Sequence, residues 1–184
     1  MTIDRQFLLN PIQTARLTLR AFTEEDVEPL HQIQRDPEAM RYTFWAASKE
    51  ESAQRLRAYA GLAAQLGYAP WTVILRSEAR IVGWGGLNVD PFEPGWGVEV
   101  AYFFDPAYWG RGFATELVRA SLIHGFHGCA LREIHAYVHP ENEASRRVLE
   151  KCGFRFQRFE PRLDRDHYII SCEEWCRGAA DLAQ

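Results

Sequence analysis

The sequence predicts an α/β protein with a single mixed central sheet of about six to seven strands, flanked by helices on both faces. Strand-like segments, marked by alternation or by β-branched and aromatic residues, are interspersed with capped helical segments in the order βααβββαβαββ. Helices that follow the strands ending at Phe104 and Val138 indicate two crossover connections and therefore some parallel pairing. A sheet covered on both faces buries this pattern.

Length and composition agree with one globular domain. The chain has 184 residues, of which 47% are hydrophobic and 25% are charged, and it has no internal repeat or linker. We therefore expect one domain over residues 1–184. The net charge of −4 disfavours nucleic acid as a partner, because nucleic-acid-binding surfaces are usually basic. No apolar run approaches the roughly 20 residues that span a bilayer, and no signal pattern is present. A cytoplasmic protein without a membrane partner is expected.

The N-terminal half is assigned from alternation and helix caps. Thr23 is a helix N-cap followed by acids, and the pair Asp36-Pro37 ends that helix. Ser48, with Glu51 three residues later, is a capping box that opens a second helix. The elements expected in this half are a strand over 16–20, helices over about 23–35 and 48–66, and strands over 71–75 and 80–89, joined by a hairpin loop at 76–79.

The C-terminal half alternates strands and helices. Gly153 closes the last expected helix as a C-cap residue. The elements expected here are a strand over 97–104, a helix over about 112–127, a strand over 133–138, a helix from 140–142 to 153, and strands over 154–159 and 167–175.

Neither histidines nor cysteines predict a metal centre. The pairs His124/His127 and His135/His139 have spacings that could share a face, but no cysteine or acid completes a tetrahedral set. No metal is therefore expected. The cysteines form no CxxC pair, the last two lie in a strand-like run, and all are expected to be reduced: Cys129, Cys152, Cys172 and Cys176.

The most informative stretch is the turn between the strand that ends at Phe104 and the helix that follows. The first N–H groups of a helix lack intrahelical partners, and the helix dipole adds partial positive charge, so together they favour an anion. Gly110 and Gly112 would let phosphate oxygens approach the backbone, and Arg111 adds a full charge. Alternatively, the two glycines only make a tight connection. The GxGxA pattern lacks the third glycine of a dinucleotide fingerprint, and no P-loop sequence is present.

Several segments occur in the order and spacing of a known family. They are Thr14–Arg20 (TARLTLR), Ile81–Leu87 (IVGWGGL), Val98–Tyr102 (VEVAY), the glycine turn with Ala114–Glu116, His139–Ser145, and Leu149–Phe154. In these segments the chain resembles the GNAT superfamily of N-acetyltransferases, in the branch related to the RimJ/RimL ribosomal-protein acetyltransferases. The resemblance covers about residues 11–175. It implies the acyl-CoA N-acyltransferase fold and acetyl-CoA as co-substrate.

The coenzyme signature of that family, [QR]-x-x-G-x-[GA], reads here as residues 109–114. Trp109 departs from the first position, whereas Gly112 and Ala114 keep the two small positions. The resemblance implies that backbone N–H groups of 110–115 bind pyrophosphate and that the strand backbone near Tyr102 and Phe104 pairs with the pantetheine arm. The coenzyme residues so implied are Tyr102, Phe104, Trp109, Gly110, Arg111, Gly112, Phe113, Ala114, Thr115 and Asn142.

Acyl transfer to an amine needs a base, donors for the oxyanion and a proton for the thiolate. Glu99 alternates with Val98 and Val100 and so faces the opposite side of its strand; the resemblance implies that it takes the proton of the amine. Alternatively, Glu99 faces water or pairs with an arginine. Ser145 is implied near the sulfur as a proton donor. Alternatively, Asn142 is a helix N-cap and Ser145 is an ordinary first-turn residue. Leu149 replaces the tyrosine acid of many family members.

The acceptor is expected to be a small-molecule or peptide amine, bound against the first two helices and their loop. The candidates for contact with it are Tyr42, Phe44, Trp45 and Trp84, although aromatic residues in such numbers more often form core. Family members acetylate protein N-termini, amino acids, polyamines or antibiotic amines, and the resemblance does not choose among these. A homodimer is a further expectation. The alternative function is a non-catalytic acyl-CoA-binding or sensing domain of the same fold.

Overall fold

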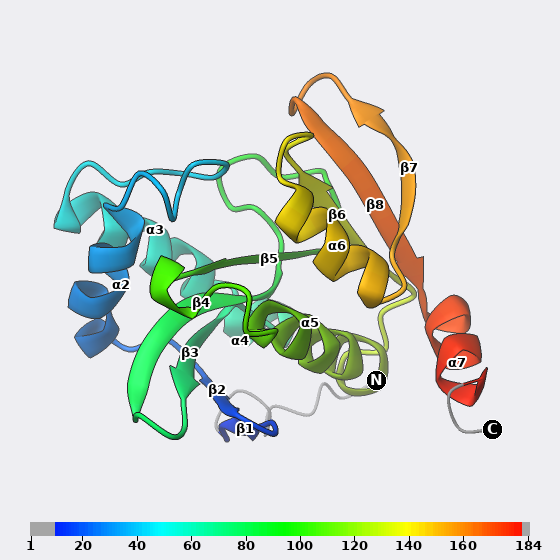
Figure 1. The fold of residues 1–184 in the computed structure, drawn as a ribbon, viewed down its shortest axis with the longest axis horizontal. Coiled ribbons are helices and arrows are strands. Elements are labelled where there is room, and N and C mark those ends of the chain that lie inside the picture. Colours follow the sequence, from blue (N-terminus) through cyan, green and yellow to red (C-terminus); the bar gives the residue numbers. More distant parts are fainter. Residues whose placement is uncertain (1–9, 182–184) are drawn as a thin grey trace.

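The computed structural model describes residues 10–181, and within them eight strands form one mixed sheet (Figure 1). Neighbouring strands follow the order β1-β2-β3-β4-β5-β6-β8-β7. The strands are β1 (Ile12–Gln13), β2 (Leu17–Arg20), β3 (Trp71–Leu75), β4 (Arg80–Asn88), β5 (Glu99–Phe104), β6 (Glu133–Val138), β7 (Arg155–Glu160) and β8 (Arg165–Ser171). The helices are α2 (Val27–Gln34), α3 (Lys49–Gly61), α4 (Ala63–Leu66), α5 (Phe113–Ile123), α6 (Glu143–Lys151) and α7 (Cys172–Asp181). Single turns of 3-10 helix cover Glu24–Asp26 and Pro106–Tyr108, and a π-helical turn over His124–Gly128 continues α5.

The predicted mixed sheet flanked by helices is confirmed, with eight described strands in place of six to seven. The strand missed by the prediction is β1, whose two residues are too few to show alternation. The capping signal at Ser48 is confirmed, because its side chain accepts a hydrogen bond from the Glu51 amide at 3.2 Å and α3 begins at the next residue.

The predicted C-terminal strand over 167–175 is wrong beyond Ser171, where α7 begins. The Glu174 amide donates to Ser171 Oγ at 3.2 Å, and the Glu174 carboxylate accepts from the Ser171 amide and hydroxyl at 3.1 Å each. These reciprocal bonds form a capping box, a helix signal that the strand-like composition concealed. Cys172 and Cys176 therefore lie on a helix, and all four cysteines are free.

Parallel pairing is limited, among the described strands, to β5 with β6. The crossover through α6 does not place β7 beside β6, because β8 lies between them and is antiparallel to both. The short connection between β7 and β8 makes them a hairpin, which stands out at one end of the molecule (Figure 1). Consequently the second crossover contributes no parallel pair.

The two faces of β5 pack against different helices. Val100 and Phe104 lie in apolar clusters with residues of α5 and α6, among them Leu117, Val118 and Leu149. Phe103, on the opposite face, packs with residues of α2 and α3. A side chain on β5 therefore faces α5 and α6 at even-numbered positions and α2 and α3 at odd-numbered ones.

The sheet opens between β5 and β6. The amide of His135 donates to the Val98 carbonyl at 2.8 Å, and Glu99 stands opposite His135 in register. The rest of β5, through Phe104, has no described partner in β6. Because the two strands are parallel, their carboxyl ends point to the same edge, and α5 and α6 begin beside the opening (Figure 1). No helix of the described residues is long and apolar enough to cross a membrane.

Candidate functional site

The turn before α5 contains two glycines in the left-handed backbone conformation. Gly110 and Gly112 have φ angles of +71° and +80°, in the left-handed region that favours glycine. Gly112 is the N-cap of α5 and supplies no side-chain cap, so the first N–H groups of the helix lack a partner from that residue. A β-carbon at Gly110 would have no atom within 4 Å, so space lies open above the turn.

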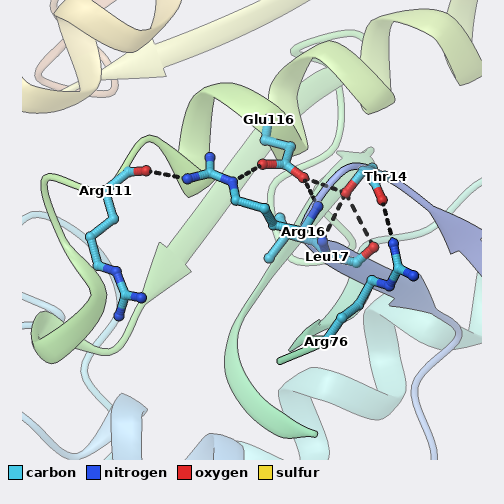
Figure 2. Close-up of polar contacts among 6 residues, drawn as sticks. All are labelled: Thr14, Arg16, Leu17, Arg76, Arg111 and Glu116. Atoms are coloured by element: carbon cyan, nitrogen blue, oxygen red, sulfur yellow. Dashed lines mark hydrogen bonds and ion pairs between the residues drawn. The ribbon is translucent and has the colours of Figure 1, made fainter. Parts of the chain in front are cut away.

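A partly buried carboxylate ties the start of α5 to the connection between β1 and β2 (Figure 2). Glu116 accepts hydrogen bonds from Thr14 Oγ1 at 2.5 Å and from the amide and Nε of Arg16 at 2.7 Å each. Burial opposes ionisation of Glu116, but these hydrogen bonds outweigh it and lower its pKa. Arg16 Nη1 also donates to the Arg111 carbonyl at 2.8 Å. The conformation of the glycine turn is thus held from outside the turn.

Aromatic rings support the turn and its positive charge. The guanidinium carbon of Arg111 lies 5.0 Å from the ring centroid of buried Phe113, and that of Arg16 lies 4.5 Å from the same ring. Trp109 is half-exposed, and its indole N–H donates to the Phe104 carbonyl at 2.9 Å. Thr14, Arg16 and Glu116 carried no predicted role, although all three lie in the segments that carry the resemblance. Their contact joins positions about a hundred residues apart, which no local pattern reveals.

The start of α6 brings Asn142 and Ser145 to the other side of the opening. The Ser145 amide donates to Asn142 Oδ1 at 3.1 Å, which confirms Asn142 as the N-cap. On the facing strand, the Tyr102 hydroxyl is buried and no described group forms a well-shaped hydrogen bond with it. Burial raises the pKa of Tyr102, and the nearby Ser145 hydroxyl partly opposes that shift. Leu149 lies beneath them, 1% exposed, in the apolar cluster.

Glu99 lies on the face of β5 that looks toward α3. Burial, reinforced by the negative charge of Asp90, raises the pKa of Glu99 to about 7. No described arginine forms an ion pair or hydrogen bond with it, so the expected alternative of a paired glutamate finds no partner. Burial, together with Asp90 and Glu99, also raises the pKa of Tyr59, whereas Arg55 opposes that shift. Tyr59 and Asp90 were not among the predicted residues.

The predicted acceptor aromatics occupy different places. Phe44 lies against Arg55, with the guanidinium carbon 3.8 Å from its ring centroid. Tyr42 stacks on His139, just before α6, at 5.0 Å between centroids. Trp45 is half-exposed and donates from Nε1 to the Arg35 carbonyl at the end of α2. Trp84 is buried in the cluster with Phe103 and meets the Tyr59 ring edge-on at 5.2 Å.

One arrangement therefore has two sides. On the α5 and α6 side, open backbone at the glycine turn, Asn142 and Ser145 border the unpaired edge of β5. On the α3 side, Glu99 lies among Asp90, Tyr59 and Arg55. The first side suits an anionic and extended ligand, and the second suits a cation that can lose a proton. Among the described residues, no group of three or more histidine, cysteine or acidic side chains could hold a metal ion.

Comparison with known proteins gives consistent matches. A family model described as an acetyltransferase (GNAT) domain matches residues 16–155. The uncharacterized N-acetyltransferase p20 of Bacillus licheniformis is 30% identical over 149 residues, which cover 80% of this chain and 83% of that protein. A GNAT-family acetyltransferase from Bacillus anthracis is 27% identical, with a TM-score of 0.71 over 89% of this chain and 99% of that one. RimL, a ribosomal L7/L12 acetyltransferase solved with coenzyme A, has a TM-score of 0.76 at 18% identity, over 90% of this chain and 99% of its own. The likeness to RimL is one of fold.

Proposed function

The chain belongs to the GNAT acetyltransferase family, and from this premise we propose that it transfers the acetyl group of acetyl-CoA to a primary amine by direct attack in a ternary complex. The observation that carries the proposal lies on β5. The carboxyl end of the strand leads into the open glycine turn. At its other end, on the face toward α3, lies Glu99, whose pKa is raised to about 7 by burial. The strand thus connects a phosphate-binding turn to a proton acceptor.

The residues around the turn fit the coenzyme. Left-handed glycines, open space at Gly110 and unpaired N–H groups suit pyrophosphate, and Arg111 adds positive charge. The edge of β5 from Tyr102 to Phe104 has no described partner in β6, and apart from the Phe104 carbonyl, which accepts from Trp109, its backbone groups can pair with the amide groups of a pantetheine arm. Asn142 borders the same opening. Coenzyme A in the RimL structure, which has the same fold, supports this assignment. Acetyl-CoA would supply the acetyl group as an activated thioester.

Glu99 takes the proton of the acceptor amine in this proposal. An alkylammonium ion cannot attack until it loses a proton, and a carboxyl group with a pKa near 7 is about half ionised at neutral pH. The negative charge of Asp90 favours a cationic amine in the same place. Tyr59, held neutral by burial and by these carboxylates, can orient the amine through its hydroxyl.

The hydroxyls of Ser145 and Tyr102 serve the departing sulfur in this proposal. At the position where many family members carry a tyrosine acid, this chain has the buried Leu149. A leucine side chain has no proton to donate, so another group must serve the sulfur. Tyr102 approaches Ser145 from β5, and its buried hydroxyl has a donor to spare. Two hydroxyls at the opening can stabilise thiolate charge by hydrogen bonds. The single-domain organisation, the cytoplasmic location and a homodimer stay predictions of the sequence.

The experiment that tests the proposal separates binding from turnover. The thermal midpoint is measured with and without acetyl-CoA, and free thiol is then measured across a panel of primary amines. Stabilisation by acetyl-CoA together with amine-dependent thiol release supports the transferase. Glu99→Gln should keep the stabilisation and lose the thiol release. Stabilisation without thiol release from any amine would support the sensing domain instead.

A further inference from the structure

Arg55 of α3 lies between two aromatic rings on the α3 side of β5. Its guanidinium carbon is 3.8 Å from the ring centroid of Phe44 and 4.3 Å from that of Phe92. Among the described residues it has no ion pair and no hydrogen bond. Arg57, two residues later on the same helix, instead pairs with Glu24 at 2.8 Å and Glu50 at 3.7 Å. Arg55 therefore differs from its helix neighbour Arg57 in having aromatic contacts in place of ion pairs.

The two rings leave the guanidinium with one kind of interaction still available. Rings that stack on a guanidinium cover its faces, whereas its N–H donors point outward in its plane. Those donors form a planar fork that matches the two oxygens of a carboxylate. Packing between Phe44 and Phe92 also restricts the side chain, so less conformational freedom is lost when the fork binds a ligand. The rings thus hold an anion-binding group that the described part of the chain does not use.

Arg55 is adjacent to the carboxylates assigned to the acceptor amine. Arg55 and Tyr59 are four residues apart and therefore share one face of α3. Phe92 contacts both, because its ring also meets the Tyr59 ring edge-on at 6.2 Å. The Tyr59 hydroxyl in turn interacts with Asp90 and Glu99. A positive group and two carboxylates thus lie around one tyrosine.

We propose that Arg55 binds a carboxylate of the acceptor, so that the preferred acceptor is an amine that also carries a carboxylate. This inference rests on the proposed function, in which Glu99 receives the amine. The ammonium group of such an acceptor lies near Glu99 and Asp90, and its carboxylate lies near Arg55, so each group meets the opposite charge. The second ammonium group of a diamine would instead be repelled by Arg55. The carboxylate belongs either to a free amino acid or to an acidic residue beside a peptide N-terminus, and both present the same planar group to the fork.

The test compares acceptors of matched length. Thiol release from acetyl-CoA gives kcat/KM for two matched pairs of acceptors. β-Alanine is compared with diaminopropane, and γ-aminobutyrate is compared with putrescine. A second arm compares alanyl-aspartate amide with alanyl-asparagine amide. We expect the acidic member of at least one pair to be favoured about tenfold or more, the effect of one charge-assisted hydrogen-bonded pair. Arg55→Glu should reverse the preference toward the diamine, whereas the control Arg57→Glu, on the exposed part of the same helix, should keep it.

Two other outcomes distinguish an error in the role of Arg55 from an error in the proposed acetyltransferase activity. If the wild type favours the acidic member of no pair, in the amino acid arm or in the peptide arm, or if Arg55→Glu lowers kcat/KM for all acceptors alike, Arg55 does not select a carboxylate although the transferase stands. If acetyl-CoA stabilises the protein but no amine releases thiol, the transferase and this inference both fail. Arg55→Met covers the case in which Arg55→Glu does not fold. It keeps an apolar side chain between the rings, and it should bring each pair to within about twofold.

Discussion

Glu99 of β5 and His135 of β6 are neighbours at the point where the two parallel strands meet. Beyond this pair the strands diverge toward the starts of α5 and α6, so Glu99 lies at the closed end of the opening (Figure 1). Burial lowers the pKa of His135, although Glu133 opposes that shift, and the imidazole is therefore neutral at pH 7. No cation from this neighbour stabilises the Glu99 carboxylate, which is consistent with a carboxyl group that titrates near neutrality.

The first prediction concerns the pH dependence of turnover. Because the carboxylate form of Glu99 accepts the proton, kcat/KM should rise with pH through an apparent pKa of about 7. Glu99→Gln should lower kcat/KM by about 10² or more and remove that limb of the profile. Thiol release measured from pH 5.5 to 8.5 checks both. Ionisation of the acceptor itself appears in both profiles, so a limb that persists unchanged in Glu99→Gln would exclude Glu99 as the base.

The second prediction concerns stability, which should fall with rising pH over the range in which kcat/KM rises. The pKa of Glu99 is raised on folding from about 4.5 to about 7, so the folded state binds the extra proton between these values. Its contribution to the free energy of unfolding is therefore fully present below about pH 4 and is lost as pH rises through about 7. Urea unfolding of wild type and Glu99→Gln at pH 5, 6, 7 and 8 measures the difference.

We expect the stability of the wild type to fall relative to Glu99→Gln by about 1 kcal/mol per pH unit between pH 5 and 7. His135 and His167 have pKa values lowered mainly by burial, so they contribute the opposite slope. Both histidines are present in the two proteins, and their contribution cancels in the difference. A constant difference across the series would mean that Glu99 ionises as freely in the folded protein as in the unfolded chain.

The third prediction concerns the glycine turn and uses a second glycine as its control. Gly110→Ala places a β-carbon in open space at a φ of +71°, which costs about 1–2 kcal/mol of strain but meets no clash. That β-carbon should obstruct phosphate and weaken coenzyme A binding about tenfold or more, as isothermal titration calorimetry can measure. Gly95 also has positive φ and open space, but it lies in the connection between β4 and β5. Gly95→Ala, at a φ of +114°, should lose at least as much stability and keep its affinity. Equal losses of affinity in both variants would locate the phosphates elsewhere.

Local signals were sufficient for most of the fold and for one face of the site. The alternation around Glu99 was enough to place it opposite Val98 and Val100, since side-chain direction in a strand has a period of two. Gly110 and Gly112 indicated a tight turn before the helix, and the structure shows that both have the left-handed backbone that favours glycine. The error at Ser171 arose where a capping signal lay inside an aromatic and β-branched run, and the two local signals conflicted.

The rest depended on contacts between distant segments. Glu116 meets Thr14 across 102 positions, and Tyr59 and Asp90 interact with Glu99 from a helix and a loop that no periodicity relates to β5. A partner for a charged residue is a tertiary fact, and a single sequence contains no local signal for it. For the same reason the sequence indicated Ser145 but not Tyr102 as a hydroxyl beside it, because Tyr102 reaches Ser145 from another element.

The last prediction turns on the Tyr102 hydroxyl, which is buried without a well-formed hydrogen bond. A buried polar group that lacks a partner lowers stability by about 1–3 kcal/mol. Tyr102→Phe should therefore raise the thermal midpoint, or leave it unchanged, while it lowers kcat, because the hydroxyl gains a well-formed hydrogen bond only when sulfur charge develops. Tyr168→Phe, a change in the same apolar cluster, is the control and should leave kcat unaltered. Ser145→Ala and the double variant complete a cycle: if the two hydroxyls act on one sulfur, the combined loss in kcat should be smaller than the product of the single losses. A Tyr102→Phe protein that is destabilised and fully active would show that this hydroxyl serves the fold instead.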